Sequence, residues 1–219
     1  MTTLPLFPLP NVVLFPGVYL PLHIFEPRYR EMVADALASD RMIGMVLLRP
    51  GWERERGRGP ASFDDNVQPP AVYPIGCNGV ITHVERQADG CSNIVLRGLE
   101  RFRILSEDHS RSYRRASIEP LTDRRLAPED HAAIRRQRAK LETLLAPAAE
   151  KTGMEIKIPS AMSDEDLVNA LAQYLDLEPL EKQALLEKPC LRTRAESLVE
   201  LLEMKVLMAR TPNVSHVAH

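Results

Sequence analysis

The sequence predicts an α+β fold, in which a strand-rich first part with one helix is followed by a bundle of about four helices. Up to residue 121 the apolar residues form short runs separated by Pro and Gly, which is typical of strands and turns. After residue 121 the apolar residues recur with the 3.6-residue period of amphipathic helices. We therefore expect a β-rich subdomain over residues 1–121, a helical subdomain over 122–210 and a flexible tail over 211–219.

The first part of the chain combines extended segments with one helix. Residues 4–25 consist of apolar runs broken by proline, which cannot donate to a β-ladder, so we expect short extended segments here rather than a central regular sheet. Pro27 is suited to the first turn of a helix, and the residues up to Leu37 place their apolar side chains on one face. Residues 42–48 predict a buried strand.

Residues 72–121 read as strands throughout. A hairpin is expected around the turn at residues 88–90, with strands over 79–84 and 93–96, and two further strands follow around 102–104 and 113–118. Arginines around Arg101 and in the segment 111–115 supply local positive charge. The acidic residues of the chain balance this charge overall, which favours a solvated strand face over a basic binding surface.

Four helices are expected in the second part. The first runs from Pro128 to about residue 149, and the third is a short helix over about 180–185. Ser163 followed by acidic residues predicts the cap of the second helix, and Thr193 with Glu196 has the spacing of a capping box for the fourth.

Composition excludes several classes of protein. The chain has 219 residues and a net charge of −2, with 28 basic and 30 acidic residues, and this balance argues against nucleic acid as a partner. No Gly is followed by Lys, so a Walker-type phosphate loop is absent from the sequence. The odd number of cysteines, three, predicts free thiols in a reducing cytoplasm. No apolar run is long enough to cross a bilayer, so no membrane partner is expected.

No arrangement of residues predicts catalysis, a metal or a cofactor. The sequence contains no Gly-x-Ser-x-Gly elbow, no His-Glu-x-x-His pair and no pair of closely spaced cysteines. His23 and Glu26 have the spacing of one half of a metal site, but Pro27 places His23 before the helix, which favours a structural role. We therefore predict no catalytic, metal-binding or cofactor-binding residues.

The segment 49–70 is charged and rich in Pro and Gly, and is expected to form a long loop. Trp52, the only Trp of the chain, lies in it. Two interpretations stay open: an aromatic anchor on a binding loop, or local packing over the β-rich core.

Several motifs together resemble those of one family. The residues of 4–9, 11–17 and 20–30, and later those of 93–98 and 101–104, closely resemble the Lon substrate-binding (Lon N-terminal) domain. The resemblance extends over about residues 4–207. The run His23-Ile24-Phe25-Glu26-Pro27-Arg28-Tyr29 is similar to the stand-alone bacterial form of that domain.

This resemblance implies a PUA-like mixed β pseudobarrel followed by a helical bundle. It also implies a non-catalytic module, because the ATPase and Ser-Lys peptidase domains of full-length Lon have no counterpart in the sequence. The expected ligand is an unfolded or extended polypeptide, and the expected roles are adaptor, chaperone-like factor or regulator of proteolysis, with a AAA+ protease as a candidate partner.

The prolines of the strand-rich part leave strand edges that an added strand could pair with. We expect binding in a cleft between the barrel and the helices, with contacts from Phe25, Trp52, Phe63 and Tyr73. The alternative hypothesis is a PUA-like barrel that binds a small molecule or RNA. The sequence leaves the oligomeric state open.

Overall fold

The computed structural model confirms the α+β class. It describes all residues except 1, 52–69, 124–125, 153–158, 160 and 211–219, so most of the predicted loop at 49–70 and the predicted tail lie outside the described residues. The strands are β1 (Thr2–Leu9), β2 (Tyr19–Ile24), β3 (Met42–Leu47), β4 (Ile75–Arg86), β5 (Ser92–Asp108) and β6 (Arg115–Leu121). The helices are α1 (Pro27–Leu37), α3 (Pro128–Thr152), α4 (Asp164–Tyr174), α5 (Pro179–Leu186) and α6 (Leu191–Arg210).

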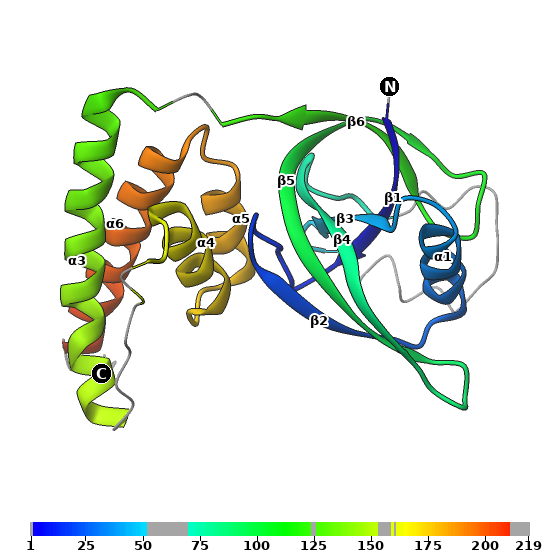
Figure 1. Cartoon of the computed structure of the whole chain (residues 1–219), viewed down its shortest axis with the longest axis horizontal. Coiled ribbons are helices and arrows are strands. Elements are labelled where there is room, and N and C mark those ends of the chain that lie inside the picture. The colour runs from blue at the N-terminus through cyan, green and yellow to red at the C-terminus, as the bar shows by residue number, and fades with distance from the viewer. Residues whose placement is uncertain (1, 52–69, 124–125, 153–158, 160, 211–219) are drawn as a thin grey trace, which may run out of the picture. The chain divides into compact units, whose positions relative to one another are not determined.

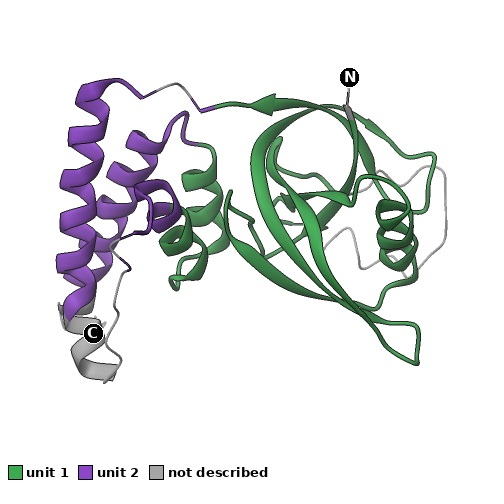
Figure 2. Ribbon diagram, in the orientation of Figure 1, with its two compact units in different colours: residues 1–122, 169–187 green, residues 123–168, 188–219 purple. Residues whose placement is uncertain are grey.

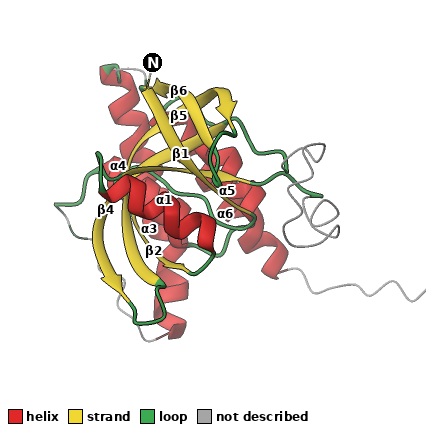
Figure 3. Ribbon diagram, turned by 90° about the vertical axis from the view of Figure 1, so that its right-hand side faces the viewer, coloured by secondary structure: helices red, strands yellow, loops and turns green. Residues whose placement is uncertain are grey.

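The described strands form one mixed sheet that closes on itself (Figures 1 and 3). Their order is β2-β5-β4-β3-β1-β6, and β6 also pairs with β5, which completes the ring. Among the described strands, β1 and β3 run parallel, and the other pairings are antiparallel. The sheet therefore has one strand outside the ring, β2, which lies on the edge of β5.

Strand β5 replaces two predicted strands. It runs without interruption for 17 residues, from Ser92 to Asp108. The ladder with β4 continues across the expected break, because Gly98 lies in register with Gly79. The length of β5 lets it pair with β2 through its first part and with β6 through its second part.

The expectation that prolines keep residues 4–25 out of a central regular sheet is wrong for β1. This strand lies between β3 and β6 in the strand order. Its first half, up to Pro5, pairs with β6, and its second half, which contains Pro8, pairs with β3. Because each half of β1 is paired on one side in this register, each proline can turn its missing donor to the unpaired side.

The interior of the closed sheet is filled with aliphatic and aromatic side chains. One buried cluster joins residues of β1, β3, β5 and β6, namely Leu4, Leu6, Val46, Phe102, Ala116 and Ile118. Helix α1 begins at Pro27 as predicted and buries the face that carries Tyr29, Met32, Val33 and Ala36. The ring of Tyr29 packs against Phe7 of β1 at a centroid distance of 4.4 Å, which fixes α1 on the sheet.

The chain divides into two compact units (Figure 2). Unit 1 contains residues 1–122 and 169–187, so the second half of α4 and all of α5 cluster with the sheet. Unit 2 contains residues 123–168 and 188–219, which include α3, the start of α4 and α6. The division of the chain into subdomains 1–121 and 122–210 stays a prediction.

In unit 1, hydrogen bonds attach the helical segment 169–187 to the strands and their loops. Asn169 donates to the carbonyl of Pro16 at 3.1 Å, and Gln173 accepts from the backbone of Phe15 at 3.2 Å. From α5, Gln183 donates to the carbonyl of Ile75 at 3.0 Å. These bonds satisfy polar groups that burial would otherwise leave unpaired.

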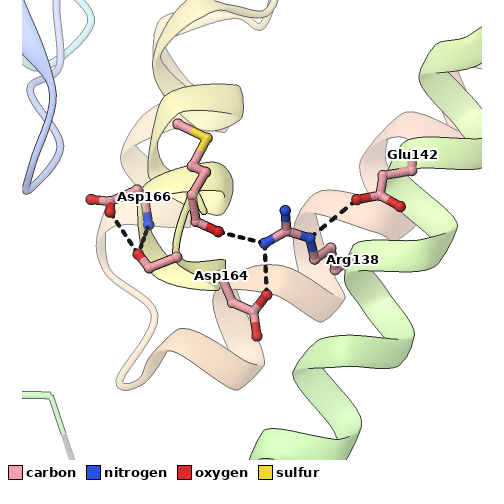
Figure 4. Close-up of polar contacts among 6 residues, drawn as sticks. Arg138, Glu142, Asp164 and Asp166 are labelled. Carbon is pink, nitrogen blue, oxygen red and sulfur yellow. Dashed lines mark hydrogen bonds and ion pairs between the residues drawn. The ribbon is translucent and has the colours of Figure 1, made fainter. Parts of the chain in front are cut away.

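In unit 2, Arg138 of α3 holds the first turn of α4 (Figure 4). Its guanidinium donates to the carbonyl of Met162 at 2.8 Å, to Asp164 at 3.0 Å and to Glu142 at 3.1 Å. Ser163 accepts from the backbone N–H of Asp166 at 3.0 Å, which confirms the predicted cap.

The predicted cap of the last helix is wrong. Helix α6 begins at Leu191, so Thr193 and Glu196 lie inside it. The hydroxyl of Thr193 donates to the carbonyl of Cys190 at 3.0 Å, while Glu196 accepts from Arg192 at 2.9 Å. Both side chains form hydrogen bonds with residues in or just before the helix, so the capping-box spacing does not mark the helix boundary here.

Candidate functional site

Strand β2 presents a continuous row of ring-bearing side chains. From Tyr19 to Phe25 the sequence alternates ring-bearing and aliphatic residues, and the pleat of a strand turns these two sets to opposite faces. The aliphatic residues are half-buried or buried, whereas the ring-bearing residues are exposed. We call the exposed set, Tyr19, Pro21, His23 and Phe25, the ring row.

Large apolar surface is exposed at both ends of the ring row. Tyr19 is 50% exposed and Phe25 is 60% exposed. The rings of His23 and Phe25 stack with a centroid distance of 6.0 Å. Exposed aromatic residues that gather along one element are a common feature of binding surfaces.

The backbone beside the ring row forms a free sheet edge. Among the described strands, β2 pairs with β5 alone. The N–H of Gly98 donates to the carbonyl of Val18 at 2.9 Å, so the carbonyl of Val18 points toward β5 and this pair occupies a hydrogen-bonded position of the ladder. Since such pairs alternate along an antiparallel ladder, the backbone groups of Tyr19, Pro21 and His23 point away from β5.

Two features reduce the number of free backbone groups on this edge. Pro21 has no N–H, and its place at an outward position agrees with the tolerance of edge strands for proline. The hydroxyl of Tyr174, from α4, donates to the carbonyl of Tyr19 at 2.9 Å. The N–H and carbonyl of His23 point outward between Pro21 and the end of the strand.

A polar row across three strands holds the imidazole of His23. His23, Asn93 and Glu85 lie directly opposite one another on β2, β5 and β4. The amide nitrogen of Asn93 donates to Glu85 at 3.1 Å, so the amide oxygen faces Nδ1 of His23 at 2.8 Å. An oxygen acceptor at this place requires the proton on Nδ1. Asn93 therefore fixes the orientation of one member of the ring row.

Of the four predicted binding residues, the described part of the chain includes Phe25 and Tyr73, and these two lie apart. Phe25 follows β2 next to Ile24, which is in register with Ser92 and hence with Arg86, the last residue of β4. Tyr73 precedes the first residue of β4, which is 12 residues long. The two side chains thus lie near opposite ends of a strand that spans about 35 Å at roughly 3.3 Å per residue.

Tyr73 has a different environment from Phe25. Its backbone N–H donates to the carbonyl of Leu47 at 2.9 Å, and the guanidinium of Arg49 lies 5.4 Å from the centre of its ring. Trp52 and Phe63 lie outside the described residues. Binding at these positions stays a prediction.

The hairpin next to the ring row carries a cysteine that is not activated as a nucleophile. Burial raises the pKa of the Cys91 thiol, and its hydrogen bond to Asp89 raises it further. The backbone N–H of Cys91 donates to Asp89 at 2.9 Å and lowers the pKa of that carboxyl. A nucleophilic thiol needs the opposite shift, toward the thiolate.

The cysteines are free, as predicted, and within the described part of the chain no three His, Cys, Asp or Glu side chains are placed to hold a metal ion. No described helix combines the length and apolar character needed to span a membrane.

Sequence reasoning found Phe25 but missed the rest of the ring row. The signal was the alternation of Tyr19, Pro21, His23 and Phe25 with aliphatic residues, which has a period of two. The prolines of the surrounding segment obscured this period, because they argued against a regular strand.

The closed mixed sheet, its edge strand β2 and the attached helices define an α+β module with an exposed strand edge. A sequence profile of the family described as the ATP-dependent protease La (LON) substrate-binding domain matches residues 3–204. The chain belongs to this family.

Several curated relatives of this chain are Lon proteases. The chain is 27% identical over 206 residues to Lon protease of Anaeromyxobacter dehalogenans, which covers 92% of this chain and 23% of that protein. It is 28% identical over 216 residues to Lon protease of Paraburkholderia phytofirmans, covering 94% of this chain and 24% of that protein. The chain therefore spans about a quarter of the length of these curated relatives.

Solved structures of Lon N-terminal domains share the fold. The crystal structure of a Lon N-terminal domain protein from Xanthomonas campestris is 24% identical, with a TM-score of 0.55 over 97% of this chain and 100% of that chain. The N-terminal domain of Mycobacterium avium complex Lon protease is 18% identical, with a TM-score of 0.65 over 92% of this chain and 98% of that chain.

Proposed function

We propose that this chain is a non-catalytic substrate-binding module that engages unfolded or extended segments of other proteins. The observation that carries the proposal is the exposed ring row of β2, because aromatic side chains supply large apolar contact area at low cost in side-chain entropy. Membership of a family described as a substrate-binding domain supports the same function.

The biological role that follows is delivery or retention of such segments for proteolysis. The similar proteins are Lon proteases, so we propose a AAA+ protease as the partner, with this chain as an adaptor, chaperone-like factor or regulator. Free cysteines, two of them buried, suit a reducing cytoplasm. Co-purification from the source cell tests the partner: recovery of a AAA+ protease supports the role, and its consistent absence contradicts it.

Binding is tested with a protein that cannot fold. A fluorescently labelled, reduced and carboxymethylated client is titrated with the chain and followed by anisotropy. The same client with its disulfides intact and its native fold is the matched control. We expect saturable binding of the unfolded client at micromolar concentrations and no binding of the folded one. A lack of saturation up to high micromolar concentration, or equal binding of both forms, contradicts the proposed function.

A further inference from the structure

We infer that an extended polypeptide segment binds by adding a strand to the free edge of β2, with its side chains alternately beside the ring row. This inference rests on the proposed function and specifies how the client is held. It assigns two separate contributions: backbone hydrogen bonds at His23 and Pro21, and apolar contact with Tyr19 and Phe25.

The geometry of the ring row selects an extended ligand over a helical one. Successive members are two residues apart on one strand, which places them about 6.7 Å apart. An added strand has the same period, so each of its residues that faces outward meets one member of the row. Side chains of a helix recur at three and four residues and match only part of such a row.

The backbone of β2 is ready for an additional strand. In this register the N–H and carbonyl of His23 point away from β5, as does the carbonyl of Pro21. Strand addition to an exposed edge gives affinity through the main chain, whatever the sequence of the client. This suits a ligand class defined by being unfolded rather than by one motif.

The ring row adds a preference for side-chain type. It contains no Asp, Glu, Lys or Arg, and Tyr19 and Phe25 are exposed at its two ends. A client with aromatic or large aliphatic residues at alternate positions therefore gains contact area along the row.

Tyr174 acts as an internal competitor for the same edge. Its side chain is 67% exposed, and its hydroxyl donates to the outward carbonyl of Tyr19 at 2.9 Å. A client that extends to Tyr19 must replace this bond by one from its own N–H. Removal of the hydroxyl frees the carbonyl and should strengthen binding.

The test compares three variants. His23→Pro removes the outward N–H, and Pro21 shows that β2 accepts proline at an equivalent outward position. His23→Ala is the matched control, because it loses the imidazole and keeps the N–H. Tyr174→Phe removes only the competing hydroxyl. The probes are the unfolded client described above and a labelled peptide of alternating Thr and Tyr.

We expect His23→Pro to bind about 3- to 10-fold more weakly than His23→Ala, as the loss of one backbone hydrogen bond predicts. Tyr174→Phe should bind about 2- to 5-fold more tightly than the unaltered chain. Equal affinity of His23→Pro and His23→Ala overturns strand addition. If circular dichroism shows that His23→Pro is unfolded, the Tyr174→Phe variant decides: tighter binding supports the inference and unchanged binding overturns it.

The two proposals fail in different ways. If the unaltered chain does not bind the unfolded client, the proposed function fails and strand addition fails with it. If the unaltered chain binds and the variants have its affinity, the function stands and the client is held at another surface.

Discussion

The guanidinium of Arg101, in the middle of β5, donates a hydrogen bond of 2.9 Å to the backbone carbonyl of Leu186, in the last turn of α5. Arg101 is only 4% exposed. The last carbonyls of a helix have no partner within it and carry its partial negative charge. A cation from the sheet therefore both caps α5 and attaches it to β5 within unit 1.

Replacement of Arg101 by Met should lower the free energy of unfolding by about 2–3 kcal/mol, because a buried carbonyl loses a charged donor. Arg103→Met is the matched control, since Arg103 is an exposed arginine on the same strand, and should change the stability by about 0.5 kcal/mol or less. Urea denaturation followed by circular dichroism measures both. Equal stability of the two variants would contradict the capping role of Arg101.

Sequence patterns predict the local elements of this fold well. The helix at Pro27 is found because proline at its first turn and an apolar face up to Leu37 are both local features. The cap at Ser163 is found for the same reason. Long-range relationships are not local: closure of the sheet by β5 and β6, and the burial of Arg101, depend on which segments meet in space. The sequence predicts a solvated strand face for Arg101, but in the fold the end of α5 covers it.

Gly98 lies where the backbone leaves no space for a Cβ atom. A Cβ at Gly98 would overlap the backbone carbonyl oxygen of Phe15, which cannot move independently. Gly98 also donates to Val18 and accepts from Gly17, so it connects β5 with the start of β2.

Gly98→Ala should therefore destabilise the protein by about 3 kcal/mol and weaken binding at β2. Its neighbour across the ladder, Gly79, provides the control. The closest atom to a Cβ at Gly79 is a side-chain methyl of Leu14, at 3.0 Å, so Gly79→Ala should cost about 1 kcal/mol. Thermal unfolding and client binding measure the two effects, and a smaller loss for Gly98→Ala than for Gly79→Ala would be inconsistent with this geometry.

Titration of Tyr113 should lower the free energy of unfolding at high pH. Burial raises its pKa to about 12, and its hydrogen bond of 2.6 Å to Asp35 of α1 contributes to the shift. The folded state therefore keeps the phenol proton at pH values where the unfolded chain, with a pKa near 10, releases it. The stability that the protonated phenol of Tyr113 gives the folded state is fully present below about pH 10 and is lost as the pH rises to about 12.

Tyr113→Phe should reduce this part of the pH dependence. Between pH 10 and 12 the unaltered chain should lose about 2 kcal/mol more stability than the variant. Below pH 10 the variant should be less stable by about 1–2 kcal/mol, because Asp35 loses a donor. Denaturation curves at several pH values test this, and parallel curves for the two proteins would exclude Tyr113 as the titrating group.

Arg138 should control the stability of unit 2. It joins α3 to the first turn of α4 through Met162 and Asp164 (Figure 4). Arg138→Gln should cost about 1–2 kcal/mol, because all three acceptors of its guanidinium lose a charged donor. Arg135→Gln, an exposed site on the same helix, should be close to neutral. Amide hydrogen exchange in α3 and α4 should report faster opening for Arg138→Gln only, and equal exchange in both variants would show that the contact is not stabilising.

The candidate site was only partly predictable. Phe25 is the one member of the ring row among the predicted binding residues. The free edge and the competing bond from Tyr174 are invisible there, because 155 residues separate Tyr174 from Tyr19. Only the strand pairing shows which backbone groups of β2 point outward.

Phe25 and Tyr73 should differ in their effect on client binding. Phe25 is exposed at the end of the ring row, whereas Tyr73 lies near the opposite end of β4 and is partly covered by Arg49. Phe25→Ala should weaken binding of the unfolded client about 5- to 20-fold, as for the loss of an aromatic contact worth about 1–2 kcal/mol. Tyr73→Ala should leave the affinity within about 2-fold. Anisotropy titrations of both variants show which end of β4 lies near the bound client. A larger loss of affinity for Tyr73→Ala than for Phe25→Ala would place the binding site away from β2.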